Sequence, residues 1–339
     1  MQVYWSETQL AHVDARFLQL GRLVASPERP ERGEFIFSEL HRRNHVITVP
    51  EDLGVDHILK VHSPGYIEFL QTIYAQWIGT YGKCSPVIPN VLSDAPPHPR
   101  LKSLIGRLGG YAGDLACEIA EGTWTASYTS AQCALNAARF TLQTGNPAYA
   151  LCRPPGHHAG ASNAMGFCYL NNSAIATQLL RKKFSRVAII DVDVHHGNGT
   201  QTIFYDRNDV FTGSMHSDPC DFYPFFSGYQ AETGTGKGIG FNSNICYSKG
   251  SSDKEFLEAF AQLIQRTHSF KPQALVVALG LDALGSDPHG EHNVSLKAYL
   301  KLAEQLKRFG LPTVIVQEGG YISNELPLAV AKFLEVFDH

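Results

Sequence analysis

Several features are scarce or missing in this 339-residue sequence, and each absence excludes a class of protein. No apolar run approaches the roughly 20 residues that a helix needs to cross a bilayer, and the first residues lack a basic stretch followed by an apolar core. Lys and Arg form no long run and the formal net charge is -4, so we expect no nucleic-acid partner and no membrane partner. The sequence predicts a globular protein of the cytoplasm.

The cysteines also do not predict a disulfide or metal framework. The seven cysteines are an odd number, are scattered, and include no C-x-x-C pair, which disfavours both a disulfide framework and a thiolate zinc site. We interpret most of them as small buried apolar side chains. Apolar residues, by contrast, make up 44% of the chain, which is enough to bury a sizeable core.

Strand and helix patterns alternate through the second half of the chain. We expect strands at 149–152, 187–191, 210–215, 240–246, 274–279 and 313–317, and helices at 171–183, 199–205, 253–268, 294–309 and 326–337. Such alternation predicts a parallel sheet with helices on both faces. No linker or repeat divides the sequence, so we expect one α/β domain over residues 1–339.

The first half is less regular. It predicts a strand at Gln2–Trp5, a polar loop to Pro30, and helices at 31–43, from Ser63-Pro64 onward, at 101–120 and at 129–144. Between the second and third helices, residues 79–100 carry five prolines that exclude regular structure: Pro86, Pro89, Pro96, Pro97 and Pro99. Long loops in compact domains usually have a function, so we expect a lid or a subunit contact.

Reactive side chains follow four of the predicted strands. They lie in the segments 153–160, 191–196, 280–288 and 318–321, each with glycine or proline nearby. Ligands of open α/β sheets bind beyond the carboxyl ends of the strands. The sequence therefore predicts a functional site at this edge of the sheet.

The segment after the strand at 187–191 suits a metal ion. Side chains two apart on an extended backbone point the same way, so Asp193 and His195 can converge, and Asp282 would supply a third ligand. Carboxylate with imidazole favours Zn²⁺, Fe²⁺ or Co²⁺ over Ca²⁺. An Asp–His hydrogen-bond network without a metal is the alternative. We interpret Asp287 as a turn residue and His196 as structural.

Other polar residues complete the predicted site. His157 and His158 follow a Pro-Pro-Gly turn, and either one of them is a general base for a water molecule or both are further metal ligands. Asp191 and Asn198 could orient these rings through their second nitrogen. Tyr321 follows two glycines and could bring its hydroxyl to a developing oxyanion.

Four motifs in this order resemble those of the zinc-dependent histone deacetylase family, within the arginase/deacetylase superfamily: Pro154-Pro-Gly-His-His-Ala159, Asp191-Val-Asp-Val-His-His-Gly-Asn-Gly199, Leu279-Gly-Leu-Asp282 and Glu318-Gly-Gly-Tyr321. The resemblance covers nearly the whole chain. The insertion before Pro99, Gly122-Thr-Trp124 and Leu151-Cys-Arg-Pro-Pro-Gly156 look most like the bacterial acetylpolyamine amidohydrolases. The resemblance to the family implies the arginase/deacetylase fold, with a parallel sheet of about eight strands. It also implies hydrolysis of an N-acetyl amide to acetate and a free amine.

The resemblance also implies a role for each matching residue. It makes Asp193, His195 and Asp282 the zinc ligands, with Fe²⁺ as an alternative metal, His158 the general base and His157 its electrostatic partner. Tyr321 becomes the carbonyl-polarising group, and Asp191 and Asn198 support the two histidines. A structural K⁺ ion is implied at Asp191, Ser214 and Met215 with the main chain of Asp193 and His195, and an acyl-lysine channel at Gly166, Phe167 and Tyr223.

The substrate stays open at this point. Where the polyamine enzymes carry acidic residues, this chain has Ile105 and Ala116, with Asp114, Glu118 and Glu121 out of register, and the acidic gatekeeper position holds His289 with Glu291 nearby. An acetylpolyamine, an acetyl-lysine or another small acetylamide is therefore the expected substrate. The insertion resembles a dimer loop, which implies a homodimer. An inactive acetylamine-binding sensor and an arginase-like manganese hydrolase are the alternatives.

Overall fold

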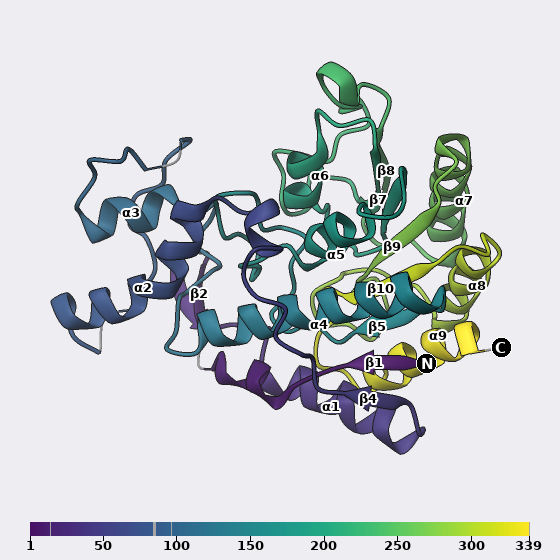
Figure 1. Ribbon diagram of the computed structural model, residues 1–339, viewed down its shortest axis with the longest axis horizontal. Coiled ribbons are helices and arrows are strands. Elements are labelled where there is room, and N and C mark those ends of the chain that lie inside the picture. The colour runs from purple at the N-terminus through teal and green to yellow at the C-terminus, as the bar shows by residue number, and fades with distance from the viewer. Residues whose placement is uncertain (14, 84–85, 96, 339) are drawn as a thin grey trace.

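The computed structural model describes residues 1–13, 15–83, 86–95 and 97–338. Its centre is one eight-stranded sheet in the order β4-β1-β5-β10-β9-β6-β7-β8, in which every neighbouring pair is parallel (Figure 1). The strands are β1 (Gln2–Tyr4), β4 (Val46–Thr48), β5 (Ala148–Ala150), β6 (Val187–Asp191), β7 (Val210–Ser217), β8 (Asn242–Tyr247), β9 (Ala274–Leu279) and β10 (Thr313–Gln317). The predicted single-domain α/β fold with a parallel sheet is confirmed.

Helices flank the sheet. They are α1 (Pro30–Arg42), α2 (Pro64–Tyr81), α3 (Leu104–Gly110), α4 (Thr123–Thr144), α5 (Asn172–Leu180), α6 (Asn198–Phe204), α7 (Asp253–Phe270), α8 (Leu296–Lys307) and α9 (Leu326–Asp338). None of the helices in the described part of the chain is long and apolar enough to cross a membrane.

Alternate strand residues build two cores, one on each face. Ala188, Ile190 and Val277 pack with apolar residues of α1, α7, α8 and α9, whereas Val187 and Ile189 pack with those of α2, α4 and α5. Because side chains of a strand alternate between faces, a strand covered on both sides must be apolar throughout. This explains why β6 and β9 were predictable as continuous apolar runs.

Local signals fix where several helices begin. The side chain of Ser63 accepts a hydrogen bond from the backbone N of Tyr66 at the start of α2, and Pro64 occupies the first helical position. Ser252 and Glu255 form a reciprocal capping box at the start of α7. The other predicted elements of the second half lie within a few residues of the observed ones.

Two predictions for the first half were wrong, and one strand was missed. The segment before Pro30 is not simply a polar loop, because it contains a short 3-10 helix (Glu7–Ala11) and a hairpin of β2 (Arg16–Gln19) and β3 (Arg22–Ala25). Its turn residues Leu20 and Gly21 both have positive φ, and Leu gives none of the usual Asn-Gly signal for such a turn. The helix expected at 101–120 ends at Gly110, and β4 was not predicted.

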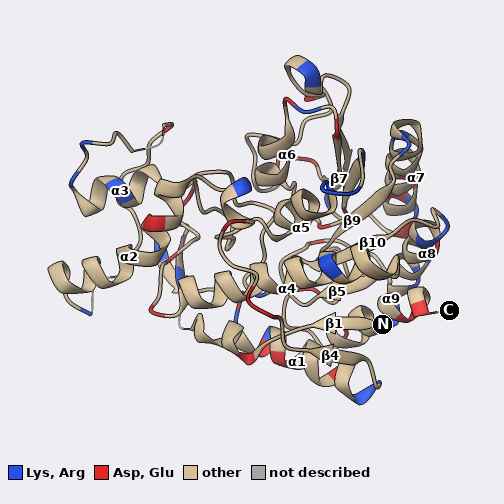
Figure 2. Cartoon of the chain, viewed as in Figure 1, with Lys and Arg blue, Asp and Glu red and all other residues tan. Residues whose placement is uncertain are grey.

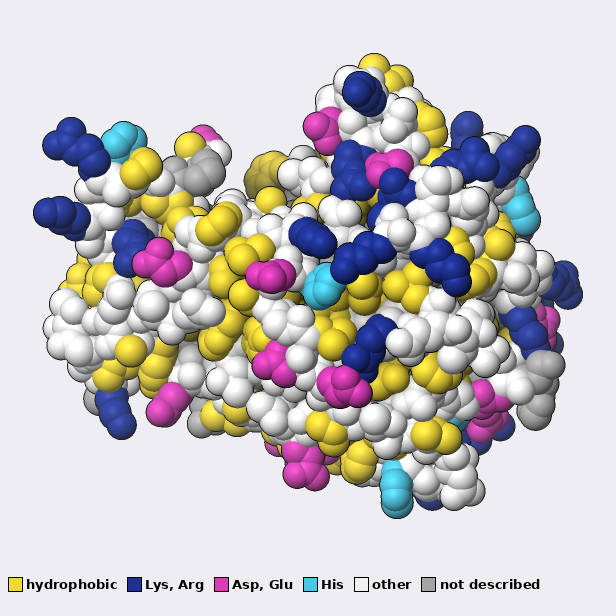
Figure 3. Space-filling view, in the orientation of Figure 1, with side chains coloured by type: hydrophobic (Ala, Val, Ile, Leu, Met, Phe, Trp, Pro, Cys, Tyr) yellow, Lys and Arg dark blue, Asp and Glu magenta, His cyan; other side chains and the backbone are white. Residues whose placement is uncertain are grey.

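The proline-rich insertion belongs to an arm that projects from the sheet. Its residues 79–81 complete α2, and the described remainder runs back to α3 at the left of Figure 1. Pro96 lies outside the described residues. Figure 3 shows apolar side chains among charged ones on this arm, and Figure 2 shows acidic and basic residues interspersed over the whole chain.

Candidate active site

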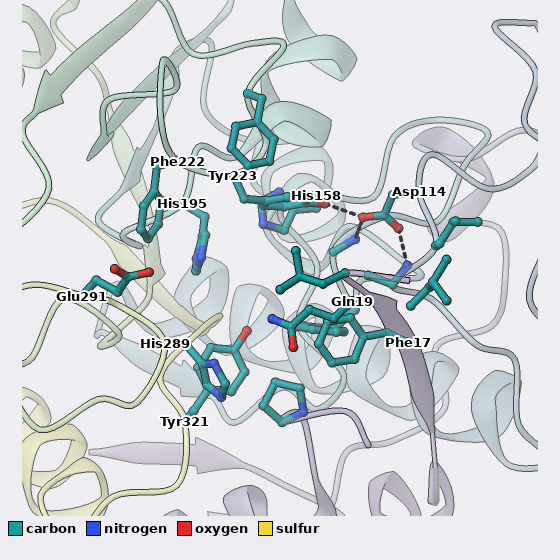
Figure 4. Close-up of a pocket in the computed structure, with 18 of the residues that line it drawn as sticks. Phe17, Gln19, Asp114, His158, His195, Phe222, Tyr223, His289, Glu291 and Tyr321 are labelled. Carbon is teal, nitrogen blue, oxygen red and sulfur yellow. Dashed lines mark hydrogen bonds between the residues drawn. The ribbon is translucent and has the colours of Figure 1, made fainter. Parts of the chain in front are cut away.

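A cavity with a volume of about 520 Å³ opens at the carboxyl ends of the strands (Figure 4). Residues from distant parts of the chain line it, including the β2–β3 hairpin, the segment 114–116, the segment 221–225 and Tyr321. None of the described residues of the 79–100 insertion is among them. The described part of the insertion therefore does not cover this cavity within one chain.

Three predicted ligands meet at the floor of the cavity, where His195 lines the cavity and Asp193 and Asp282 are fully buried next to it. One ligand atom each of Asp193, His195 and Asp282 lies within 4.8 Å of the others, and His195 Nδ1 is 3.0 Å from Asp193 Oδ1 and 3.1 Å from Asp282 Oδ2. Burial opposes ionisation of Asp193, but the charges of His157 and His195 hold the pKa of its carboxyl below the usual range. Burial and the charge of Asp193 raise the pKa of Asp282. Two buried carboxylates this close require a compensating cation.

Glycines make room for this cradle. A Cβ atom on Gly280 would lie 2.1 Å from Asp193 Oδ2, and one on Gly319 would lie 2.2 Å from Asp282 Oδ2. The backbone N of Gly319 also donates to Asp193 Oδ2 at 2.7 Å. The two carboxylates and one imidazole fit Zn²⁺ or Fe²⁺ by donor chemistry.

The two histidines of the Pro-Pro-Gly turn differ in their surroundings. His157 Nδ1 is 2.9 Å from Asp191 Oδ2, His158 Nδ1 is 2.7 Å from Asn198 Oδ1, and the two rings are 4.0 Å apart. Burial alone would lower the pKa of His157, but Asp193 and Asp191 raise it to about 10. Burial and the charges of His157 and His195 lower the pKa of His158 well below its usual value. Only His158 lines the cavity.

Glu318 is a site residue to which the sequence interpretation gave no role. Its carboxylate accepts hydrogen bonds from the backbone N of Gly156 at 2.7 Å, from that of His157 at 3.0 Å and from Ser173 Oγ at 2.8 Å. Burial raises the pKa of this carboxyl to about 7. Glu318 thereby ties the histidine turn to the end of β10. Its position directly after an apolar strand, next to Gly-Gly, was the available signal.

Tyr321 stands at the cavity wall, and its hydroxyl points into the space in Figure 4. Its ring lies 6.3 Å from that of Phe167 and 4.9 Å from that of His289. Its backbone N donates to Asp287 Oδ2 at 2.6 Å, and the other oxygen of Asp287 accepts from the backbone N of His289. Asp287 is thus the turn residue that its position before Pro288 predicted.

The turn of Tyr321 has a second support, which the sequence did not indicate. Arg32 of α1 donates to the backbone oxygens of Glu318 and Gly320, and its guanidinium lies 5.9 Å from the centre of the Tyr321 ring. Arg32 is 1% exposed, so these hydrogen bonds form away from water. A cation on the first helix therefore fixes the last motif of the chain.

The residues predicted for a potassium site lie on two adjacent strands. Asp191 of β6 is in register with Ser214 of β7, and both border a small void of about 10 Å³, whereas Met215 is buried but does not border it. His196 lies beside this void with Nε2 3.1 Å from Gln201 Oε1. That contact agrees with a structural role for His196.

The three residues predicted for a substrate channel all line the cavity. Gly166 and Phe167 have positive φ values of 56° and 66°, and a Cβ on Gly166 would lie 2.4 Å from His158 Cδ2. Phe17 of the hairpin packs edge-on against Phe167 at 5.4 Å. The hairpin, absent from the sequence prediction, therefore completes the channel wall.

Carboxylates dominate the charge around the cavity. Asp114, Asp221 and Glu291 line it, whereas no Lys or Arg is among its described lining residues. Glu291 forms an ion pair with Lys249, while Asp221 is exposed and has no ion pair in the described structure. Glu118, considered from the sequence, instead pairs with Arg16 at 3.3 Å and does not line the cavity.

Comparisons with known proteins agree with this site. The histone deacetylase domain model matches residues 26–337. The acetylpolyamine amidohydrolase of Burkholderia pseudomallei is 37% identical over 99% of this chain and 98% of that protein, and that of Mycoplana ramosa is 36% identical over 99% of each. A crystal structure of the acetylpolyamine aminohydrolase from Burkholderia pseudomallei superposes with a TM-score of 0.96 at 37% identity, covering 99% and 98% of the two chains.

The fold and the site together define a hydrolase that acts on amide bonds. The chain belongs to the histone deacetylase family. The resemblance stated from the motifs is confirmed, and the alternative of an inactive sensor is not supported.

Proposed function

We propose that this protein is a zinc-dependent deacetylase that hydrolyses the N-acetyl amide of an acetylpolyamine, releasing acetate and a free amine. The convergence of Asp193, His195 and Asp282 at the floor of the cavity carries the proposal. The names of the relatives at 36–37% identity point to the substrate class. A cavity lined by carboxylates and by no Lys or Arg among the described residues suits a cationic substrate.

The metal would sit among the three ligands. Zinc held there would polarise the acetamide carbonyl and lower the pKa of a water molecule. Fe²⁺ suits the same donors, so the metal present in the cell depends on supply. The three protein ligands leave room for water and substrate, as a catalytic site requires.

The side chains of the cavity would move the protons. The Nε2 atom of His158 accepts a proton from the attacking water, because its Nδ1 is engaged by Asn198 Oδ1. The charged ring of His157, held by Asp191, stabilises the negative charge that develops, and the Tyr321 hydroxyl donates to the oxyanion. When the C–N bond breaks, a protonated histidine delivers its proton to the leaving amine.

The far end of the substrate would meet the rim of the cavity. Asp114 is already bound to Tyr223, and Glu291 is already paired with Lys249. Asp221 is the exposed carboxylate of the rim that has no ion pair in the described structure, so we assign the distal ammonium first to Asp221. Glu291, which also lines the cavity, is the second candidate for binding this ammonium.

Two further features belong to the proposal. A potassium ion between β6 and β7 is supported by the void that Asp191 and Ser214 border, and it would neutralise part of the carboxylate charge behind the metal. A cytoplasmic location is supported by the six described cysteines, none of which forms a disulfide.

We also propose a homodimer formed through the arm of α2, the insertion and α3. Val91, Leu92 and Leu101 on this arm are 52%, 50% and 38% exposed, which a partner chain would cover. Light scattering after size exclusion should give the mass of two chains, and Leu92→Glu should give the mass of one. A monomeric wild-type protein would contradict this part.

The experiment is acetate release from N-acetylputrescine by purified protein, first stripped of metal by a chelator and then reloaded with one zinc per chain. Zinc should restore turnover, and the released amine should equal the released acetate. Turnover that persists without metal would refute the metal-dependent mechanism. Binding of N-acetylputrescine without any hydrolysis would refute the proposed activity.

A further inference from the structure

Asp114 lies where three segments of the cavity wall meet, and the geometry points to a role for it that the sequence did not suggest. We infer that Asp114 is a positioning residue that clamps the two sides of the substrate channel together and so sets its width. The inference rests on the proposed function in one respect, namely that an acylated amine passes through this channel.

The carboxylate of Asp114 accepts three hydrogen bonds from the protein itself. Its Oδ2 accepts from the Tyr223 hydroxyl at 2.6 Å and from the backbone N of Gly166 at 3.1 Å, and its Oδ1 accepts from the backbone N of Ala116 at 2.9 Å (Figure 4). One side of the channel is thus bound to the other through a single side chain. A carboxylate with these three donors offers little to a substrate ammonium.

Two of the three partners of Asp114, Tyr223 and Gly166, lie directly against the histidines of the site. The Tyr223 ring meets the rings of His158 and His195 edge-on, at 5.1 Å and 6.0 Å. Gly166 packs against His158 so closely that a Cβ would lie 2.4 Å from its ring. A shift of either wall would therefore change the space beside the proposed base.

The hairpin adds a third connection to the same point. The backbone N of Leu18 in β2 donates to the oxygen of Leu115, the residue after Asp114, and Phe17 packs on Phe167, the residue after Gly166. The segment of Asp114 thus joins the hairpin, the Gly166 turn and Tyr223. Loss of the carboxylate would leave the Tyr223 hydroxyl without this hydrogen-bond partner at a partly buried position, which destabilises the fold.

If Asp114 clamps the channel, its loss should change substrate selectivity in a way that the loss of an ammonium ligand would not. Asp114→Ala should lower kcat/KM about tenfold for N-acetylputrescine and equally for N-pentylacetamide, in which a methyl group replaces the ammonium. The same variant should lose less activity towards N-butyrylputrescine, because a wider channel admits the larger acyl group. Asp114→Asn, whose amide oxygen still accepts from Tyr223, should recover most of the acetyl activity.

The experiment is a double-mutant cycle of Asp114→Ala with Tyr223→Phe, read in kcat/KM and in melting temperature. The two substitutions should be non-additive in both readouts, because each removes the same hydrogen bond. Tyr128→Phe is the matched control. The hydroxyl of Tyr128 donates to Asp52 Oδ1 at a distance of 2.5 Å, and neither residue lines the cavity. Combined with Asp114→Ala, Tyr128→Phe should be additive.

The outcomes separate the clamp from the proposed function. Additive effects of Asp114→Ala and Tyr223→Phe in melting temperature would overturn the clamp, whether or not the protein is active. A loss of activity confined to the charged substrate would make Asp114 an ammonium ligand and also overturn it. No turnover of any acylamine by the zinc-loaded wild type, with non-additive melting temperatures, would refute the proposed function and leave the clamp standing.

Discussion

The floor and the mouth of the cavity are built in opposite ways. At the floor, Asp193 and Asp282 are fully buried, and backbone donors from distant segments fix their oxygens. At the mouth, Leu20 at the hairpin tip is 97% exposed and Phe226 beside the segment 221–225 is 92% exposed. Buried ionic groups must be paired and hydrogen-bonded, which restricts their arrangement, whereas exposed side chains can occupy several rotamers.

This difference assigns separate tasks to the two regions. The floor carries the groups that would perform amide hydrolysis, and each of them is held by a second residue, as Asn198 holds His158 and Asp191 holds His157. The mouth carries the groups that would distinguish one acylamine from another. Substitutions at the floor should therefore abolish turnover, and those at the mouth should change preference.

The largest effect is expected from removing a metal ligand. Asp282→Ala should bind no stoichiometric zinc and should lose more than the roughly 100-fold that an outer-shell residue costs. Metal analysis by mass spectrometry together with acetate release measures both quantities. Asp206→Asn, which removes an exposed carboxylate away from this cavity, is the control. Full zinc content in the Asp282→Ala variant would show that this carboxylate is not a ligand.

The next effect concerns the hydroxyl of Tyr321. Tyr321→Phe should keep its zinc and its KM but lose about 10²–10³-fold in kcat, the usual cost of one oxyanion donor. Steady-state kinetics on N-acetylputrescine provides the measurement. An unchanged kcat would remove Tyr321 from the mechanism and leave it as a wall residue beside Phe167 and His289.

A smaller effect is expected from the residue that holds the histidine turn. Glu318→Gln keeps the shape but replaces one acceptor oxygen by a donor, so one of the contacts to Gly156, His157 and Ser173 is lost. We expect kcat to fall about 10–100-fold with zinc retained. If KM rises while kcat stays constant, Glu318 supports substrate binding and does not position His157.

His12 and His62 lie outside the floor and, unlike the charged His157, are neutral. Burial and the charge of Arg153 lower the pKa of His12 to about 3, and burial lowers that of His62 to about 4. Their contribution to stability is complete above pH 6.5, which is the pKa of histidine in the unfolded chain. It is lost as the pH falls towards the pKa values of the folded protein, because the unfolded state then binds more protons. Each should add about 1.4 kcal/mol per pH unit to the slope of stability below pH 6.5.

The measurement for this prediction is the unfolding free energy from denaturant titrations between pH 7 and pH 4.5. His62→Gln should be less stable at pH 7, because His62 Nε2 accepts from the backbone N of Asn171, but its stability should depend less on pH. A variant slope equal to the wild-type slope would mean that His62 does not stay neutral in the folded protein.

The sequence predicted the floor better than the mouth for a physical reason. The strands β6, β9 and β10 are covered on both faces, so they appear as apolar runs, and the metal-site residues must follow them directly. The mouth depends on the hairpin at 16–25 and on the loop of Asp114, where positive φ at Leu20 and contacts between distant segments decide the structure. Such contacts leave no local pattern.

The same reasoning explains the residues that the sequence interpretation missed. Arg32 and Glu318 act through backbone groups of distant segments, and a hydrogen bond to a backbone atom does not depend on the identity of its residue. Gly280 and Gly319 were visible only as parts of motifs. Their purpose, space for two carboxylates, follows from the three-dimensional arrangement.

The most direct test of the division between floor and mouth is the ratio of kcat/KM for N-acetylputrescine to that for N-pentylacetamide. Wild type should prefer the charged substrate, and Asp221→Asn should lower this preference by up to about fivefold, the range of an exposed ion pair. Tyr321→Phe should slow both substrates equally and leave the ratio unchanged, as should the surface control Glu258→Gln. A ratio that changes in Tyr321→Phe and stays constant in Asp221→Asn would contradict the account.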